Sequence, residues 1–311
     1  MDQITKNYIK IALAGVFWGT IGLFGKTLEG YGMSSEMIAF SRQFAGFSIL
    51  FIIFLIKDPS VLRIDRKGLK SAMIIGVVSQ GIFNLAYFGS IKLVGTFTAV
   101  VLLYFSPVIM FLLGTFMYRE KSSRKKVFSV LLCLTGCVYG VTGGDFSTLQ
   151  SNTAGILLGL TAALTYSLMP ALSKKTTTMY NPFTIIIYSF MFGAIMLIPF
   201  AKPVASIMAV QDKAVFLIIP VFGFISSSIP YCLYIPSLHN VQVSKLGVIA
   251  SIELVVSIAI AVLFLKEPLS AGKVAGAAII MASILINEHE YRAAALSQEI
   301  QICQEIMPQG Q

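Results

Sequence analysis

Three charged residues lie inside stretches of the sequence that are otherwise strongly apolar. Glu253 lies in SIELVVS, Lys245 precedes it by eight residues in VSKLGVIA, and Arg42 lies in IAFSRQF. A charge at the centre of a membrane helix costs about 2.5–3.5 kcal/mol on insertion scales, so such residues usually face a cavity or a partner. These three residues are therefore the first candidates for binding chemistry.

Glu253 and Lys245 each support two interpretations. Eight residues of helix leave their side chains about 80° apart and about 12 Å apart along the axis, so they share a broad face without touching. In a transporter, Glu253 binds a substrate amine or a proton, and Lys245 faces a carboxylate or repels cations. In a purely structural role, Glu253 accepts hydrogen bonds from neighbouring helices and Lys245 extends its ammonium group to the membrane surface. Both interpretations stay open.

Arg42 keeps its charge in any surroundings, so it needs an anion, a cavity or carbonyl oxygens. Glu36, six residues earlier, is a candidate partner at the start of the same helix. We favour a structural or gating role for Arg42. Pro107 and Pro230 receive the same assignment, because a proline within a helix frees the carbonyl one turn earlier.

Two stripes of polar and aromatic residues indicate a binding cavity. Gln80, Asn84 and Tyr87 are spaced by four and three residues, which places them on one face of a helix. A cavity for a small molecule needs aromatic walls and a few directional donors and acceptors; ordinary hydrogen bonding between helices is the alternative. The equivalent stripe in the second half consists of Ser227, Tyr231 and Tyr234, and further walls are expected from Trp18, Tyr104 and Tyr166.

The elements that must position these residues are membrane helices. The 311-residue chain is 56% hydrophobic and only 12% charged, with a mean hydropathy of +0.83, which is far from the composition of a soluble domain. Each apolar stretch is about long enough to cross the hydrocarbon core as a helix, and none alternates as a barrel strand does. The sequence predicts an all-α polytopic membrane protein with ten transmembrane helices at about 9–28, 37–56, 71–91, 95–117, 127–142, 155–173, 183–201, 214–235, 243–265 and 272–287.

The distribution of Lys and Arg predicts a cell-membrane protein with both termini in the cytoplasm, because the loops on that side carry most of the positive charge. The net charge of +9 is explained in this way. The basic segment YREKSSRKK falls in a loop between two spans, so it faces anionic lipid and no nucleic-acid partner is expected. No phosphate-binding loop or metal-ligand spacing occurs, so no cofactor or metal is expected, and the four cysteines are expected to be free thiols.

The two halves of the sequence repeat one another. MYREKSSRKK after the fourth span resembles FLKEPLSAGK after the ninth, with Glu120 and Glu267 147 residues apart, and Trp18 corresponds to Tyr166 at an offset of 148. A unit of five spans is followed by a unit that enters the membrane from the other side, so the repeats are inverted and a substrate site is expected between them. The expected divisions are a first repeat at 1–147, a second at 148–287 and a cytoplasmic tail at 288–311.

Taken together, these motifs resemble the EamA-type transporters of the drug/metabolite transporter superfamily. The resemblance rests on FWGTIGLFGK in the first span, YFSPVIMFLLGTF in the fourth, and SIELVVS and FLKEPLS in and after the ninth. Leu254 departs from the pattern, because the family commonly has proline there. The resemblance implies ten spans built as five plus five, and transport of small metabolites, often export of amino acids or related compounds.

We therefore expect a secondary transporter of small polar metabolites that works by alternating access, driven by a gradient or by exchange. If protons are coupled to transport, Glu253 is the only carboxylate expected well inside a span. A transporter or flippase for lipid-like molecules is the alternative. A membrane-embedded enzyme is not expected, because it would need several acids, nucleophiles or metal ligands at one depth. The sequence carries no signal for an oligomeric state.

Overall fold

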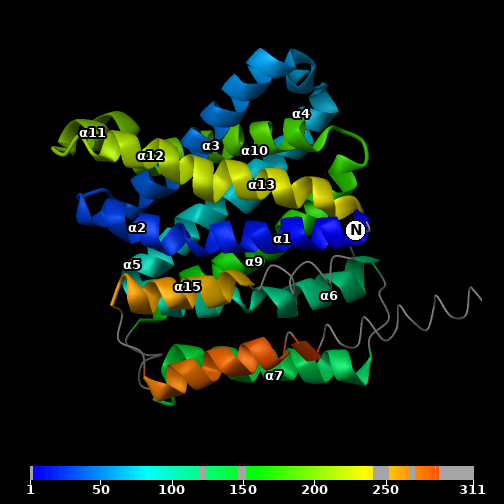
Figure 1. The fold of residues 1–311 in the computed structure, drawn as a ribbon, viewed down its shortest axis with the longest axis vertical. Coiled ribbons are helices and arrows are strands. Elements are labelled where there is room, and N and C mark those ends of the chain that lie inside the picture. Colours follow the sequence, from blue (N-terminus) through cyan, green and yellow to red (C-terminus); the bar gives the residue numbers. More distant parts are fainter. Residues whose placement is uncertain are drawn as a thin grey trace, which may run out of the picture.

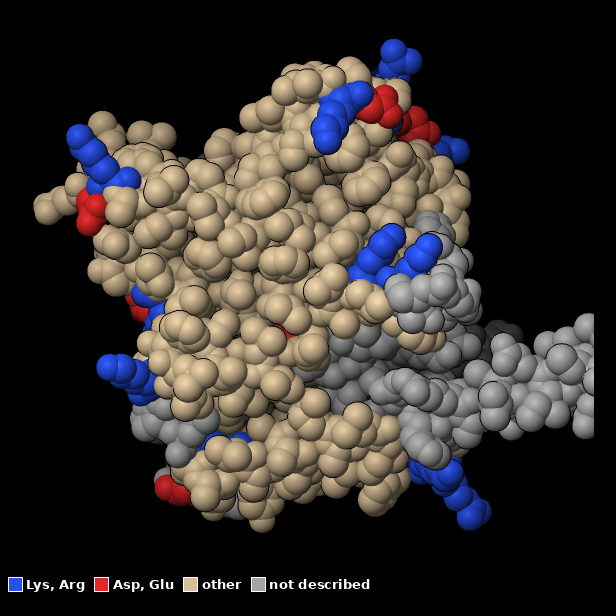
Figure 2. All heavy atoms as spheres, in the orientation of Figure 1, with Lys and Arg blue, Asp and Glu red and all other residues tan. Residues whose placement is uncertain are grey.

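The computed structural model describes residues 3–118, 123–145, 152–240, 252–266, 270–283 and 285–286. Every regular element within those ranges is helical, and Figure 1 shows most of the helices lying along one common direction. Large apolar side chains, among them Ile56 and Leu217, are exposed on the outside of this bundle. Figure 2 shows a face whose middle is largely free of charged residues, while Lys, Arg, Asp and Glu gather towards its edges. Such a surface suits a bundle surrounded by lipid.

The part of the chain up to residue 145 is called the first half here, and the part from residue 152 the second half. The first half contains α1 (Gln3–Gly19), α2 (Ile21–Gly30), α3 (Ser35–Lys57), η1 (Pro59–Leu62), α4 (Arg66–Ile75), η2 (Gly76–Ile82), α5 (Phe83–Leu103), α6 (Ser106–Tyr118) and α7 (Arg124–Thr142). The second half contains α9 (Thr153–Thr177), α10 (Pro182–Ala201), α11 (Pro203–Ala209), α12 (Val215–Gly223), η3 (Phe224–Ser228), α13 (Ile229–Tyr234), η4 (Ile235–Asn240), α15 (Ile252–Leu263) and a last helix, Ala271–Ser283.

Six helical segments in the described part are long and apolar enough to cross a membrane, and three shorter apolar helices accompany them. The ten stretches expected from the sequence coincide with helices, within a few residues, wherever the structure describes them. The six long segments are Lys6–Gly30, Ser35–Lys57, Arg66–Leu113, Thr153–Lys174, Pro182–Ala201 and Val215–Ser237, of which the third covers two expected stretches.

Short polar residues start several of these helices. The Ser34 hydroxyl accepts a hydrogen bond from the backbone N–H of Met37 at the start of α3, at 3.2 Å. The Asp65 carboxylate accepts one from the N–H of Gly68 at the start of α4, at 2.7 Å. Each cap satisfies a backbone donor that has no partner within the helix.

Three interruptions divide helices of the first half. Thr20 separates α1 from α2. Gly95 has a φ of 82° inside α5, a left-handed conformation that favours glycine, and it marks the junction of the third and fourth expected spans. Tyr104 and Phe105 separate α5 from α6, and Pro107 lies in the first turn of α6, where its missing N–H costs no helical bond. The fourth span is therefore broken at this point.

Two π-helical turns lie at matching places in the two halves. η2 begins at Gly76, between α4 and α5, and η3 begins at Phe224, between α12 and α13. Their starts are related by the same offset as Trp18 and Tyr166. A π-turn shifts the backbone hydrogen bonds of a helix by one residue and is frequent at functional sites. Gln80 lies in the first of these turns and Ser226 in the second.

Glycines bring α7 close to the last helix, and Figure 1 shows α7 beside that orange helix at one edge of the bundle. A Cβ added to Gly136 would lie 2.8 Å from the backbone N of Ile280 and 2.9 Å from the carbonyl oxygen of Gly276. The Ser129 hydroxyl donates to the carbonyl of Ser283 at 2.5 Å. Close approach of this kind is what small residues permit between membrane helices.

Candidate functional site

A buried network of polar side chains joins the two halves of the chain. The Tyr231 hydroxyl on α13 donates to the Oε1 of Gln80 at 3.1 Å, and the Nε2 of Gln43 on α3 donates to the same oxygen at 3.2 Å. All three residues are buried. The polar stripe predicted on 80–87 and its counterpart in the second half therefore meet through Gln80 and Tyr231.

Arg42 on α3 is part of the same interior and is only 1% exposed. Its Nη1 donates to the Oδ1 of Asn84 at 2.6 Å, and its Nη2 donates to the carbonyl oxygen of Ser226 in η3 at 2.8 Å. The sequence suggested Glu36 as the partner of Arg42, and this prediction is wrong. Of the described residues, only Lys26 and Glu29 form an ion pair, so Arg42 instead bonds to neutral groups from distant parts of the chain.

Aromatic rings from both halves surround Trp18 on α1. The ring centroid of Trp18 lies 6.4 Å from that of Tyr166, 5.3 Å from that of Tyr231 and 5.0 Å from that of Tyr234, all in edge-to-face arrangements. Its buried Nε1 has no hydrogen-bond partner among the described residues. Such a cluster offers ring faces to a cation and one indole N–H to an acceptor.

Glu253 is 4% exposed and lies in the first turn of α15. No hydrogen bond or ion pair of its carboxylate is found within the described residues, although it lies in the electric field of Arg42. The Tyr104 hydroxyl, at the break in the fourth span, accepts a hydrogen bond from the N–H of Leu254 at 2.9 Å. A carboxylate at a helix N-terminus is stabilised by the helix dipole.

The remaining predicted residues are distributed as follows. Tyr87 stacks on Phe83 with centroids 5.5 Å apart, and Phe83 lies 5.7 Å from Tyr166, so Tyr87 belongs to the edge of the aromatic cluster. Pro230 is buried at the start of α13. Lys245 lies outside the described residues, and its two interpretations remain predictions.

Sequence reasoning missed three contributors to this interior. Gln43 follows Arg42 directly and was detectable as a second polar residue in an apolar span. Phe83 carries no signal that separates it from other membrane phenylalanines. Ser226 contributes a backbone carbonyl from a π-turn, and no residue type in the sequence predicts such a carbonyl.

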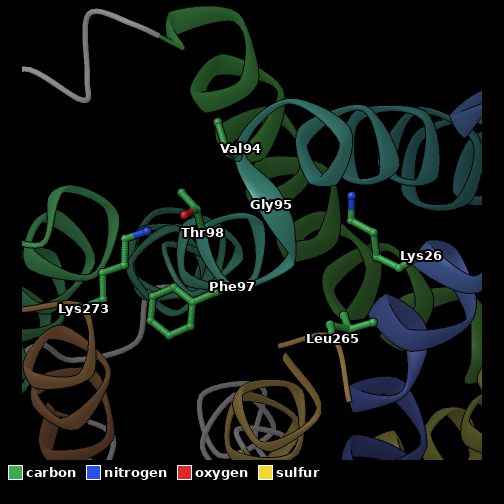
Figure 3. A pocket seen from close by; sticks show the side chains of 7 residues that line it. All are labelled: Lys26, Val94, Gly95, Phe97, Thr98, Leu265 and Lys273. Atoms are coloured by element: carbon green, nitrogen blue, oxygen red, sulfur yellow. The ribbon is translucent and has the colours of Figure 1, made fainter. Parts of the chain in front are cut away.

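A cavity of about 510 Å³ opens where α2, the kink in α5, the end of α15 and the start of the last helix come together. Figure 3 shows Lys26 and Lys273 on two sides of it, with Gly95 between them. The Lys273 ammonium lies 6.0 Å from the ring centroid of Phe97. Lys26 belongs to the first half, where its ammonium pairs with Glu29 at 2.8 Å, and Lys273 belongs to the second half. The opening therefore lies between the halves, and Lys273 adds a positive charge to it. The described residues hold no group of three or more His, Cys, Asp and Glu placed for a metal ion.

A solved crystal structure shares this fold: it has a TM-score of 0.69 and 17% sequence identity, covering 93% of this chain and 99% of that one. The chain is 23% identical over 301 residues to "Uncharacterized inner membrane transporter YicL" of Salmonella typhimurium, covering 95% of this chain and 99% of that protein. It is 25% identical over 268 residues to "Uncharacterized transporter YxxF" of Bacillus subtilis, covering 84% and 83%.

An "Uncharacterized transporter" of Archaeoglobus fulgidus is 25% identical over 281 residues, covering 89% of this chain and 94% of that protein. The EamA-like transporter family matches twice, over residues 5–142 and 153–287, which together include every described residue that forms the buried network and the aromatic cluster. The chain therefore belongs to the EamA-like transporter family and is a multi-pass membrane transporter.

Proposed function

We propose that this protein is a secondary transporter that moves small polar metabolites, amino acids or related compounds, by alternating access. Its ten spans form two inverted repeats of five helices in a cell membrane, with both termini in the cytoplasm. The paired π-turns support this arrangement, because they recur in the two halves at one offset in the sequence. The close packing of α7 against the last helix also joins the two halves. Transport is driven by a gradient or by exchange.

The observation that carries the proposal is that both halves supply side chains to one buried polar and aromatic cluster. Tyr231 and Ser226 come from the second half, and Gln80 and Arg42 come from the first. A transporter that rocks one half against the other needs its substrate site at the surface between them. Within the cluster, Tyr231 and Gln80 are joined across that surface by a hydrogen bond between two neutral side chains, which can be exchanged for a bond to a substrate.

The polarity of the cluster favours a soluble metabolite over a lipid. Buried charges such as Arg42 and Glu253 are costly next to hydrocarbon. A lipid tail in the same place would leave both charges unpaired, whereas a polar metabolite gives each of them a partner. Glu253 binds a substrate amine or a coupled proton in this proposal.

The test is thermal unfolding of the detergent-purified protein in the presence of a panel of soluble metabolites. A ligand at about 100 times its dissociation constant stabilises the folded protein by about 2.7 kcal/mol, which gives a clear shift in unfolding temperature. Compounds that bind are then tested as exchange substrates in reconstituted vesicles. We expect binding and exchange of at least one amino acid or related compound.

The variant Glu253→Gln separates the two roles of this carboxylate. Loss of binding of amine-bearing compounds makes Glu253 a substrate contact, while retained binding with a lost pH dependence of exchange makes it the proton site. Glu36→Gln is the matched control, because it makes the same change on α3 outside the cluster and leaves both properties intact. A panel in which no soluble metabolite binds, while lipid-like compounds do, contradicts the proposal.

A further inference from the structure

Arg42 is the one fully buried cation among the described residues, and its hydrogen bonds are incomplete. A guanidinium has five N–H donors in a fixed plane. Nη1 and Nη2 donate to Asn84 and Ser226, and the Tyr231 hydroxyl is a further contact of the guanidinium, so these three partners are neutral. The buried Nε–H has no hydrogen-bond partner within the part of the chain that the structure describes. Donors therefore remain for a further acceptor.

The charge of Arg42 is also left unpaired in the described part of the protein. Arginine does not lose its proton in proteins, so it cannot escape the cost of burial by becoming neutral. Glu253 acts on it through the electric field, and no ion pair joins these two residues. A structural arginine in such surroundings is normally paired with a carboxylate. The missing component is an anion.

The neighbours of Arg42 hold its guanidinium in a defined orientation. Asn84 uses its own Nδ2 to donate to the carbonyl of Gln80 at 2.6 Å, which turns its Oδ1 towards Arg42. Ser226 offers its carbonyl from the π-turn η3 on the opposite half. A guanidinium fixed from both halves is preorganised, which lowers the entropy lost when it binds a planar oxyanion.

We infer that Arg42 binds an anionic group of the transported metabolite, and that this group is a carboxylate. The inference rests on the proposed function and names the chemistry of its substrate. A doubly charged phosphate fits less well, because only one cation occupies the described cluster and Glu253 adds a negative charge to it. A single carboxylate neutralises Arg42 and matches its planar donors.

The cavity between Lys26 and Lys273 is consistent with a negatively charged group. It lies at the surface between the halves, and the two lysines come from different halves (Figure 3). Positive charge at an opening raises the local concentration of anions and favours their passage inward. A substrate thus meets the positive charge of Lys273 at this opening, where Lys26 is paired with Glu29, and a second positive charge at Arg42.

The first experiment needs only the wild-type protein. Unfolding temperatures are measured with matched sets of three compounds, namely an amino acid, its decarboxylated amine and its deaminated acid. One set is leucine, isoamylamine and 4-methylpentanoate, and another is phenylalanine, phenethylamine and 3-phenylpropionate; the full series of amino acids and small dicarboxylates extends the panel. We expect stabilisation only by compounds that carry a carboxylate.

The second experiment uses Arg42→Gln and Arg42→Lys with the compounds that bind. Arg42→Gln lowers the affinity for carboxylates by at least about 30-fold, the loss typical of removing one partner of a buried charge pair. Arg42→Lys restores part of this affinity, because lysine keeps the positive charge but lacks the planar donors. Ser41→Ala is the control, because Ser41 is a buried neighbour whose hydroxyl bonds only to its own helix, and it leaves the preference for carboxylates unchanged.

The outcomes separate this inference from the proposed function. If amines or neutral metabolites bind as tightly as their carboxylate counterparts, the inference is overturned and the transport proposal stands. The same conclusion follows if Arg42→Gln folds and keeps the wild-type preference for carboxylates, since Arg42 is then only a structural link between the halves. If no soluble metabolite binds the wild type, both proposals fall.

Discussion

The Tyr231 hydroxyl in the second half donates to the Oε1 of Gln80 in the first half at 3.1 Å, and this bond lies beside the link from Arg42 to Ser226. One bond joins two neutral side chains, and the other joins a charged side chain to a backbone carbonyl. Neutral hydrogen bonds between membrane helices contribute about 0.6 kcal/mol on average. Contacts of that strength hold one arrangement of the halves and can still be exchanged during transport.

Tyr231→Phe tests the strength of this contact. The phenyl ring fills the same space, and Gln80 keeps its bond from Gln43, so no buried oxygen is left without a partner. We expect a loss of about 0.5–1.5 kcal/mol in the free energy of unfolding, measured as a lower unfolding temperature in detergent. Tyr139→Phe is the control on an exposed face of α7. Equal unfolding temperatures for Tyr231→Phe and wild type would mean that the bond adds no stability.

The close packing of α7 against the last helix predicts that Gly136 tolerates no larger residue. Gly136→Ala places a methyl group 2.8 Å from the backbone N of Ile280, so the two helices must separate. We expect a loss of about 1–3 kcal/mol from this overpacking, although alanine favours a helix over glycine by about 1 kcal/mol. Differential scanning fluorimetry of the purified protein measures the loss as a lower unfolding temperature.

Gly30→Ala is the matched control for that substitution. Gly30 ends α2, and a Cβ at this position meets no atom within 4 Å. We therefore expect Gly30→Ala to show only the helix preference of alanine, with an unchanged or slightly higher unfolding temperature. If both variants behave alike, close packing at Gly136 does not limit stability.

The positions of the membrane helices were predictable because they depend on a property that adds up along the chain. A helix that crosses lipid must be apolar over its whole length, so its signal does not depend on distant residues. The break in the fourth span was only partly foreseen. Pro107 was expected inside a helix, but the structure places it in the first turn of α6, directly after Tyr104 and Phe105.

The contacts of Arg42 were not predictable, because they join residues that are far apart in the sequence. Its partners Asn84 and Ser226 lie 42 and 184 residues away, whereas the sequence pointed to Glu36 in the same helix. The π-turn that presents the Ser226 carbonyl depends on packing between helices. In contrast, Gln80 was found from helical spacing, and Tyr231 from the repeat, which matches it to Asn84.

Asp65 predicts a pH-dependent stability outside the membrane spans. It accepts hydrogen bonds from the Gly68 N–H at 2.7 Å and from the Tyr180 hydroxyl at 2.8 Å, which tie the start of α4 to the turn before α10. The Gly68 bond and then the Tyr180 bond lower the pKa of Asp65, and the latter raises the pKa of Tyr180. A lowered pKa in the folded state means that this stabilisation is complete above the ordinary aspartate value of about 3.9. It is lost as pH falls through the lower folded value.

We expect the unfolding temperature of the wild type to fall more steeply between about pH 5 and about pH 3 than that of Asp65→Asn. Asparagine still accepts the capping bond but cannot titrate, so the substitution isolates the charge. Tyr180→Phe removes one cause of the lowered pKa and should give an intermediate slope. If the unfolding temperatures of all three proteins fell with the same slope at acid pH, other carboxylates would set the stability in acid.

The lysines at the cavity predict a salt-dependent affinity. Lys273 is half-buried at the opening, and Lys273→Ala removes its positive charge without touching the Arg42 cluster. If carboxylates pass this opening, the variant binds them several-fold more weakly at about 0.01 M salt, and the difference shrinks at about 0.5 M salt, where charges are screened within a few ångströms. Lys213→Ala, at an exposed lysine outside the cavity, keeps the wild-type affinity at both salt concentrations. Equal affinities for Lys273→Ala and wild type at low salt would mean that the charge of Lys273 does not act on the bound carboxylate.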